Sequence, residues 1–156
     1  MTGQPKRAVK PVPEGYHTVT PFLTVPGLAK TIEFLKQAFG AEVRGVMNAP
    51  GGRIAHGEVK IGDSIVMMGE PMPNGPYPPR PANLYVYVPN VDEVYARAIQ
   101  AGGKSLSEPK DQFYGDRGAG VEDPSGNQWW IGTHIEDVST EELERRMAAM
   151  AAGGQH

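Results

Sequence analysis

The chain has 156 residues, of which 39% are hydrophobic and 21% are charged, so it can bury the core of one ordinary globular domain. A formal net charge of -3, without a basic cluster, argues against a nucleic-acid partner and favours a small organic ligand. Because the chain contains no cysteine, no apolar run long enough to cross a membrane and no signal-peptide pattern, we expect a cytoplasmic protein without disulfides or a membrane partner.

Residues 1–15 contain three prolines and no periodic apolar pattern, which predicts an extended arm. Residues 16–70 then predict the order β-α-β-β-β. Apolar residues alternate over 18–25 as in a strand and then recur at helical spacing from Leu28 until Gly40. Three further strands are expected at 42–47, 53–61 and 64–69.

A proline-rich segment, residues 71–82, cannot join a central strand because each proline lacks a backbone donor, so it is interpreted as a linker. The same order of elements follows in residues 83–135. Its predicted elements are a strand at 83–88, a helix capped by Asn90, and strands at 104–106, 119–122 and 128–134. Residues 136–156 predict a last helix, capped by Ser139, and a tail.

An internal duplication relates the two halves at a constant offset of about 63 residues. Val25-Pro26-Gly27 aligns with Val88-Pro89-Asn90, and Asp63-Ser64 aligns with Gly126-Asn127. A unit of this size is too short to bury a large core alone, so the two copies are expected to pack together as one α+β domain. The sequence therefore predicts two tandem β-α-β-β-β repeats that form a cupped mixed sheet and enclose a cleft.

Strand alternation separates the side chains under the helices, such as Val19, Leu23 and Val25, from those that face the cleft. The predicted inward set is aromatic with a few polar points: Thr20, Phe22, His56, Glu58, Met67, Asn83, Tyr85, Tyr87, Gln128 and Trp130. Such a lining suits an aromatic or amphipathic ligand. The alternative is that Phe22, Met67 and Trp130 fill a closed core.

Several motifs make the chain resemble the vicinal oxygen chelate superfamily, the glyoxalase/bleomycin-resistance/dioxygenase group. Within that superfamily the chain is most similar to the PhnB-like branch. The motifs are Tyr16-His17-Thr18-Val19-Thr20-Pro21, Ala38-Phe39-Gly40-Ala41-Glu42, the segment 56–64, the segment 111–117 and Asp123-Pro124-Ser125-Gly126-Asn127. The resemblance implies the paired-repeat fold and a homodimer, in which swapped and unswapped arrangements are equally compatible with the sequence.

The resemblance also implies where a metal would bind, because enzymes of that superfamily hold one divalent ion at the central position of the first and last strand of each repeat. Those positions carry Thr20, Met67, Asn83 and Trp130 here. A hydroxyl, a thioether, an amide and an indole do not balance a divalent charge. We therefore expect no cofactor and no metal ligands.

Two other groups of residues are candidates for chemistry. His56 and Glu58 lie on one face of a predicted strand and are the candidate catalytic pair, either for acid–base chemistry or for weak binding of one divalent metal ion. The alternative is a plain hydrogen bond between them. Arg117 is a candidate to grip an anionic group at the mouth of the cleft, and the alternative is an ion pair with Asp116.

Three functions remain open at this point. The leading hypothesis is a metal-free protein that binds a small ligand through Thr20, Phe22, Met67, Asn83, Tyr85, Tyr87, Arg117, Gln128 and Trp130. The second is a lyase, isomerase or dioxygenase that uses His56 and Glu58. A pure interaction module is the third, although no surface outside the arm and tail suggests docking.

Overall fold

The computed structural model describes residues 9–76 and 78–153. The first repeat contains β1 (Phe22–Thr24), α1 (Leu28–Phe39), β2 (Glu42–Asn48), β3 (Ile54–Ile61) and β4 (Ser64–Gly69). The second repeat contains β5 (Asn83–Tyr87), α2 (Val91–Gln100), β6 (Lys104–Asp111), β7 (Asp116–Glu122) and β8 (Gln128–His134), and is followed by α3 (Thr140–Gly153).

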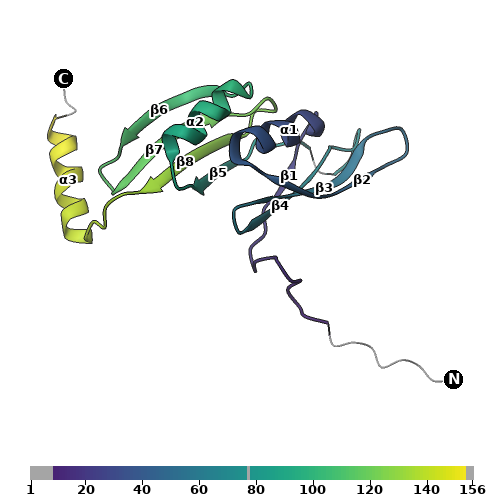
Figure 1. Ribbon diagram of the computed structural model, residues 1–156, viewed down its shortest axis with the longest axis horizontal. Helices are drawn as coiled ribbons and strands as arrows, with labels where there is room; N and C mark the ends of the chain where they lie inside the picture. Colours follow the sequence, from purple (N-terminus) through teal and green to yellow (C-terminus); the bar gives the residue numbers. More distant parts are fainter. Residues whose placement is uncertain (1–8, 77, 154–156) are drawn as a thin grey trace.

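Each repeat forms its own four-stranded mixed sheet. The strand orders are β1-β4-β3-β2 and β5-β8-β7-β6, with one parallel pair in each sheet, β1 with β4 and β5 with β8. The two sheets lie side by side along the long axis of the molecule (Figure 1). The α+β fold of two tandem β-α-β-β-β repeats is therefore confirmed, with its strands in two sheets.

The two repeats are joined through α1 and α2, which pack against each other and share one hydrophobic core. Arg97 on α2 donates to the carbonyl oxygen of Ala38 on α1, over 3.4 Å. A turn of the second repeat also reaches the first: the Ser125 hydroxyl lies 2.6 Å from the Thr31 hydroxyl and 2.8 Å from the carbonyl oxygen of Pro26. Because the helices cover one face of each sheet, the opposite face, called here the open face, is left for other contacts.

The first strand is shorter than the alternation predicts. It begins at Phe22, and the predicted position of Val19 under the helix is wrong, because Val19 is 83% exposed. The Thr20 hydroxyl donates to the carbonyl oxygen of His17 over 2.9 Å, so the chain turns locally before the strand. Pro21 lacks an N–H and contributes only its carbonyl oxygen, which accepts from the Met67 amide over 2.9 Å.

The second strand of the second repeat is longer than predicted, since β6 continues to Asp111 through Pro109. β6 is an edge strand, and its pairing with β7 is irregular between Ser107 and Lys110. A proline is tolerated at such a place because an edge strand leaves part of its backbone unpaired. The extension matters because it brings Lys110 beside Gly118 of β7.

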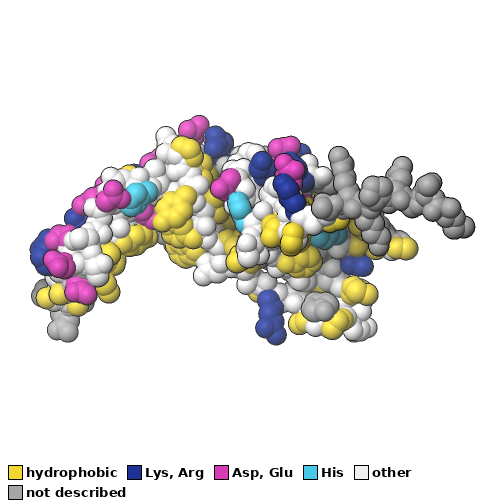
Figure 2. Space-filling view, turned by 90° about the horizontal axis from the view of Figure 1, so that it is seen from below, with side chains coloured by type: hydrophobic (Ala, Val, Ile, Leu, Met, Phe, Trp, Pro, Cys, Tyr) yellow, Lys and Arg dark blue, Asp and Glu magenta, His cyan; other side chains and the backbone are white. Residues whose placement is uncertain are grey.

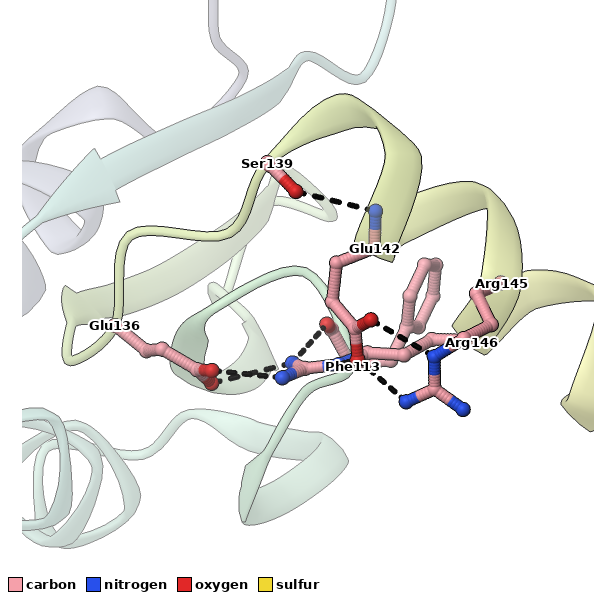
Figure 3. Close-up of polar contacts among 6 residues, drawn as sticks. All are labelled: Phe113, Glu136, Ser139, Glu142, Arg145 and Arg146. Atoms are coloured by element: carbon pink, nitrogen blue, oxygen red, sulfur yellow. Dashed lines mark hydrogen bonds and ion pairs between the residues drawn. The ribbon is translucent and has the colours of Figure 1, made fainter.

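Helix α3 lies at the end of the molecule beyond the second sheet and has no buried residue (Figure 1). Its predicted cap is present: the Glu142 amide donates to the Ser139 hydroxyl over 3.2 Å. The Arg146 guanidinium attaches the helix to the body by donating to the Glu136 carboxylate, at 2.7 and 3.1 Å, and to the Phe113 carbonyl oxygen, at 3.0 Å (Figure 3). Polar contacts therefore hold α3 in place.

Most of the predicted arm and the end of the predicted tail, residues 1–8 and 154–156, lie outside the described residues. Within the described part of the chain, no helix is both long enough and apolar enough to span a membrane. The cytoplasmic location stays a prediction.

Candidate functional site

The open face of the second sheet carries two aromatic rings that lie flat against the backbone. Tyr85 of β5 and Trp130 of β8 are neighbours in the sheet. A Cβ at Gly120 would lie 2.5 Å from Cζ3 of Trp130, and a Cβ at Gly132 would overlap the Tyr85 ring. The two glycines thus provide the space in which the rings lie. Tyr85 is 44% exposed, so this aromatic surface is open to a ligand.

A buried carboxylate fixes this surface at one end. The Asp116 side chain, whose residue is only 3% exposed, accepts from the Tyr85 hydroxyl over 2.8 Å and from the Tyr87 hydroxyl over 3.0 Å. Its other oxygen lies 2.9 Å from Nδ1 of His134. Nε2 of His134 lies 2.7 Å from the Asp137 carboxylate. The network orients both phenols and holds an imidazole between two carboxylates.

This network shifts the ionisation of its members. Burial raises the pKa of the Tyr85 phenol above its ordinary value, and the hydrogen bond to Asp116 raises it further. Burial also raises the pKa of the Asp116 carboxyl, but hydrogen bonds from His134, Tyr85 and Tyr87 outweigh that effect, so the pKa lies below its ordinary value. Hydrogen bonds to Asp137 and Asp116 raise the pKa of His134. The arrangement therefore favours a charged His134 beside an ionised Asp116.

The open face of the first sheet carries the candidate catalytic pair. Nε2 of His56 lies 2.9 Å from one Glu58 oxygen, and the Tyr16 hydroxyl donates to the other. Hydrogen bonds from His56 and Tyr16 lower the pKa of Glu58 below its ordinary value. The ring of Phe22 lies 6.0 Å from that of His56, measured between centroids. The result is a carboxylate that accepts hydrogen bonds from two donors and has an aromatic ring nearby.

The structure distributes the predicted ligand-binding residues over separate places. Phe22 pairs with Met67 in the first sheet, whereas Asn83 pairs with Gln128 in the second sheet. A hollow of about 410 Å³ adjoins Phe22 and is lined by residues of the first repeat and the start of the linker. Thr20 lies before β1, in its contact with His17. Within one chain, the aromatic half on the second sheet and the His56 half on the first are thus two distinct surfaces.

A groove of about 630 Å³ does run between the two repeats. It is lined by the turn at Gly62, by Ile65, and by residues 84–87 of β5, which include Tyr85 and Tyr87. Trp130 and Met67 do not line it. The groove follows the seam between the repeats rather than the open faces on which most predicted residues lie. Viewed from below Figure 1, apolar side chains lie at the surface near the middle of the molecule, and charged ones gather at the end that carries α3 (Figure 2).

Arg117 lies on the helix side of the second sheet, away from the aromatic surface. Its guanidinium donates to both oxygens of Asp92 at the start of α2, over 2.8 and 2.9 Å, and to Asp111 over 3.0 Å. Alternation places neighbouring residues of β7 on opposite faces, so Asp116 and Arg117 point apart. Arg117 therefore pairs with Asp111 across the β6–β7 hairpin and with Asp92, rather than with Asp116.

The donor sets do not fit a divalent metal ion. The resemblance implies metal-binding positions at Thr20, Met67, Asn83 and Trp130. In the sheet register, the residues opposite Met67 and Trp130 are Phe22 and Tyr85. None of these side chains is a carboxylate or an imidazole. Within residues 9–76 and 78–153, no group of three or more His, Cys, Asp or Glu side chains has a metal-binding arrangement.

Sequence reasoning missed several site residues. Tyr16 occurs in one of the motifs, but no local pattern predicts that its hydroxyl donates to Glu58 from a segment before the first strand. No local pattern indicates a role for His134, and the sequence indicates Asp116 only as a partner of Arg117. The sequence does contain a signal for the aromatic surface in β7 and β8, where strand glycines at 118, 120 and 132 alternate with larger residues.

Comparisons with known proteins agree with this architecture. An uncharacterized protein of Mycobacterium bovis is 28% identical over 144 residues, covering 86% of this chain and 95% of that protein. The crystal structure of TioX from Micromonospora sp. ML1 matches with a TM-score of 0.61 and 26% identity, covering 75% of this chain and 96% of that one. A lactoylglutathione lyase from Agrobacterium tumefaciens matches with a TM-score of 0.56 and 21% identity, covering 80% of this chain and 96% of the other.

A family model matches residues 16–131, which include the whole first repeat and the second repeat as far as Ile131 in β8. The chain therefore belongs to the Glyoxalase/Bleomycin resistance protein/Dioxygenase superfamily.

Proposed function

We propose that this protein binds a small aromatic or amphipathic molecule on the aromatic surface of the second sheet and does so without a metal ion. The observation that carries the proposal is the pair of rings, Tyr85 and Trp130, spread flat over Gly132 and Gly120. A core would stack such rings against other side chains, whereas a flat, partly exposed aromatic surface offers stacking to a planar ligand. The oriented hydroxyls of Tyr85 and Tyr87 add polar points that fix its direction.

We also propose that the protein acts as a homodimer in which a second copy covers the open faces. Phe22 is 58% exposed, Met47 64% and Tyr87 65%, so both sheets present apolar surface that one chain leaves uncovered. A second copy is a suitable partner because its aromatic surface can face the His56 surface of the first chain, while its His56 surface faces the aromatic surface of the first chain. Sedimentation equilibrium tests this part, and a protein that stays monomeric at micromolar concentration would refute it.

The binding proposal is tested with two neutral probes, indole and 2-naphthol, by isothermal titration calorimetry. Trp130→Ala and Tyr85→Ala remove the rings and are expected to raise the Kd at least tenfold, which corresponds to about 1.4 kcal/mol. Met147→Ala, on the exposed side of α3, is the matched control and leaves the Kd unchanged. If neither probe binds the wild type, or if the ring variants bind as well as the wild type, the proposal fails.

A second candidate function is an enzyme whose acid–base pair is His56 and Glu58. The observation in its favour is the hydrogen-bonded triad of Tyr16, Glu58 and His56 on an open sheet face. The similarity to a lactoylglutathione lyase, at 21% identity, supports the fold alone. In this case His56→Ala abolishes turnover of a substrate whose binding survives, and equal activity in that variant would refute it.

We also propose that the chain belongs to the PhnB-like branch of the superfamily. The motifs at 38–42 and 111–117 support this proposal.

A further inference from the structure

A small pocket opens beside the aromatic surface, on the β6 side of the second sheet. Its volume is about 270 Å³, slightly below the range of about 300–1,000 Å³ that is usual for ligand sites. Tyr85, Tyr114 and Trp130 supply aromatic walls, and Ser107, Lys110 and Gln112 supply a polar rim. The walls come from β5, β8 and the turn before β7, whereas the rim comes from β6 and the turn after it.

The floor of this pocket is Gly118, which lies between Lys110 of β6 and Gly132 of β8. A Cβ at Gly118 would meet its nearest atoms, Cγ of Gln112 and the carbonyl oxygen of Ile131, at 3.6 Å, which is ordinary contact. The backbone there does not adopt a positive φ. Unlike Gly120 and Gly132, Gly118 therefore relieves no clash. A strand glycine weakens a sheet, and here its visible effect is to keep the pocket floor open.

The rim has the chemistry of an anion site. Lys110 is exposed and forms no ion pair with any of the described residues. Of the other basic residues of this strand pair, Lys104 does not line the pocket, and Arg117 is on the opposite face and pairs with Asp92 and Asp111. Gln112 and Ser107 offer uncharged donors next to the ammonium group. A cation beside aromatic walls suits a planar ring that carries one negative group.

We propose that this pocket binds an aromatic carboxylic acid, with its mono- or bicyclic ring over Gly118 against Trp130 and Tyr85 and its carboxylate at Lys110 and Gln112. The inference rests on the proposed binding function and names its ligand class. The volume admits a bicyclic ring but not a large polycyclic one. The ring is held by stacking and the acid by a charge-assisted hydrogen bond, so both parts of the molecule are needed for full affinity.

The test compares 2-naphthoate with 2-naphthamide, which has the same ring and no charge, by isothermal titration calorimetry on the full chain. The wild type is expected to bind 2-naphthoate at least tenfold more tightly than the amide. Lys110→Met is expected to remove this preference while binding of the amide persists. Lys104→Met, on the same strand but outside the pocket, is the matched control and keeps the preference.

A second variant fills the floor without removing a polar group. Gly118→Val is expected to abolish binding of 2-naphthoate, while Gly45→Val, at a strand glycine with open space around it, leaves binding unchanged. Circular dichroism and the Tm of Gly118→Val show whether it folds, and Lys110→Met keeps the inference testable if it does not. Equal affinity for acid and amide in the wild type, or a preference that survives Lys110→Met, overturns the inference. Failure of indole and 2-naphthol to bind refutes the broader proposal separately.

Discussion

The turn at residues 123–127 depends on one buried carboxylate, and replacing it is expected to destabilise the whole fold. Asp123 is 4% exposed and accepts four hydrogen bonds: one oxygen binds the amides of Ser125 and Asn127, over 2.8 and 3.0 Å. The other oxygen binds the Asn127 side-chain amide and the Trp129 indole N–H, both over 2.9 Å. Because Ser125 of this turn also contacts α1, the carboxylate supports the junction between the repeats.

The substitution Asp123→Asn preserves the shape of the side chain but replaces one oxygen by an NH₂ group. That NH₂ group would face either the amides of Ser125 and Asn127 or the side-chain donors of Asn127 and Trp129. Because Trp129 and Asn127 are almost fully buried, their donors cannot turn to water instead. Two hydrogen bonds to a charged acceptor are lost, at about 1.5–3 kcal/mol each, so the free energy of unfolding should fall by about 3–6 kcal/mol. For a chain of this size the Tm should fall by roughly 10 °C or more.

Urea unfolding at one fixed protein concentration, followed by tryptophan fluorescence, measures this loss because Trp129 is buried in the core. Asp63→Asn is the matched control: Asp63 is in the exposed turn between β3 and β4, and its side chain accepts from the Ser64 hydroxyl over 2.9 Å. The control should change stability by less than about 0.5 kcal/mol. A loss below about 1 kcal/mol for Asp123→Asn would refute the reasoning, because the buried donors would then have found other partners.

Two further predictions concern pH. His56 and Tyr16 hold the pKa of Glu58 low, so its stabilising contribution is present above the unfolded-state pKa and is lost as pH falls through the folded-state pKa. Tyr16→Phe should raise the Glu58 pKa in an NMR titration, and an unchanged value would show that the Tyr16 bond has no effect. Hydrogen bonds to Asp137 and Asp116 raise the pKa of His134, so its contribution is full below the unfolded-state pKa and is lost as pH rises through the folded-state pKa. The stability difference between wild type and His134→Asn should shrink from about pH 5 to about pH 9, and a constant difference would contradict the prediction.

Local signals in the sequence were enough to predict most of the fold. The cap at Asn90 is present, since its side chain accepts from the Glu93 amide over 3.2 Å, and Gly40 ends α1 in a left-handed conformation. Errors arose where tertiary context decides. Alternation alone predicts a strand from residue 18, but the strand begins only at Phe22, after Pro21. The strand predicted at 104–106 continues to Asp111, because an irregular edge strand accommodates Pro109.

The candidate site was predictable only where the signal is local to one strand. Alternation along single strands predicts that Tyr85 and Tyr87 share one face and that His56 and Glu58 share another, and in the structure the members of each pair lie next to each other. Contacts between distant segments, such as Asp116 with Tyr85 or Tyr16 with Glu58, depend on how separate strands and the first segment are arranged in space. Periodicity along one strand contains no information about that arrangement.

The central claim is that the protein binds its ligand on an aromatic surface without a metal ion, and its metal content tests this most directly. Untagged protein, purified without chelator and then incubated with nickel, manganese or zinc, is desalted and measured by elemental mass spectrometry. The account predicts no stoichiometric divalent ion, because the positions indicated by the resemblance and by the sheet register carry Thr20, Phe22, Met67, Asn83, Tyr85 and Trp130 rather than carboxylates or imidazoles. One tightly retained divalent ion per chain would contradict the account and direct attention to His56 and Glu58.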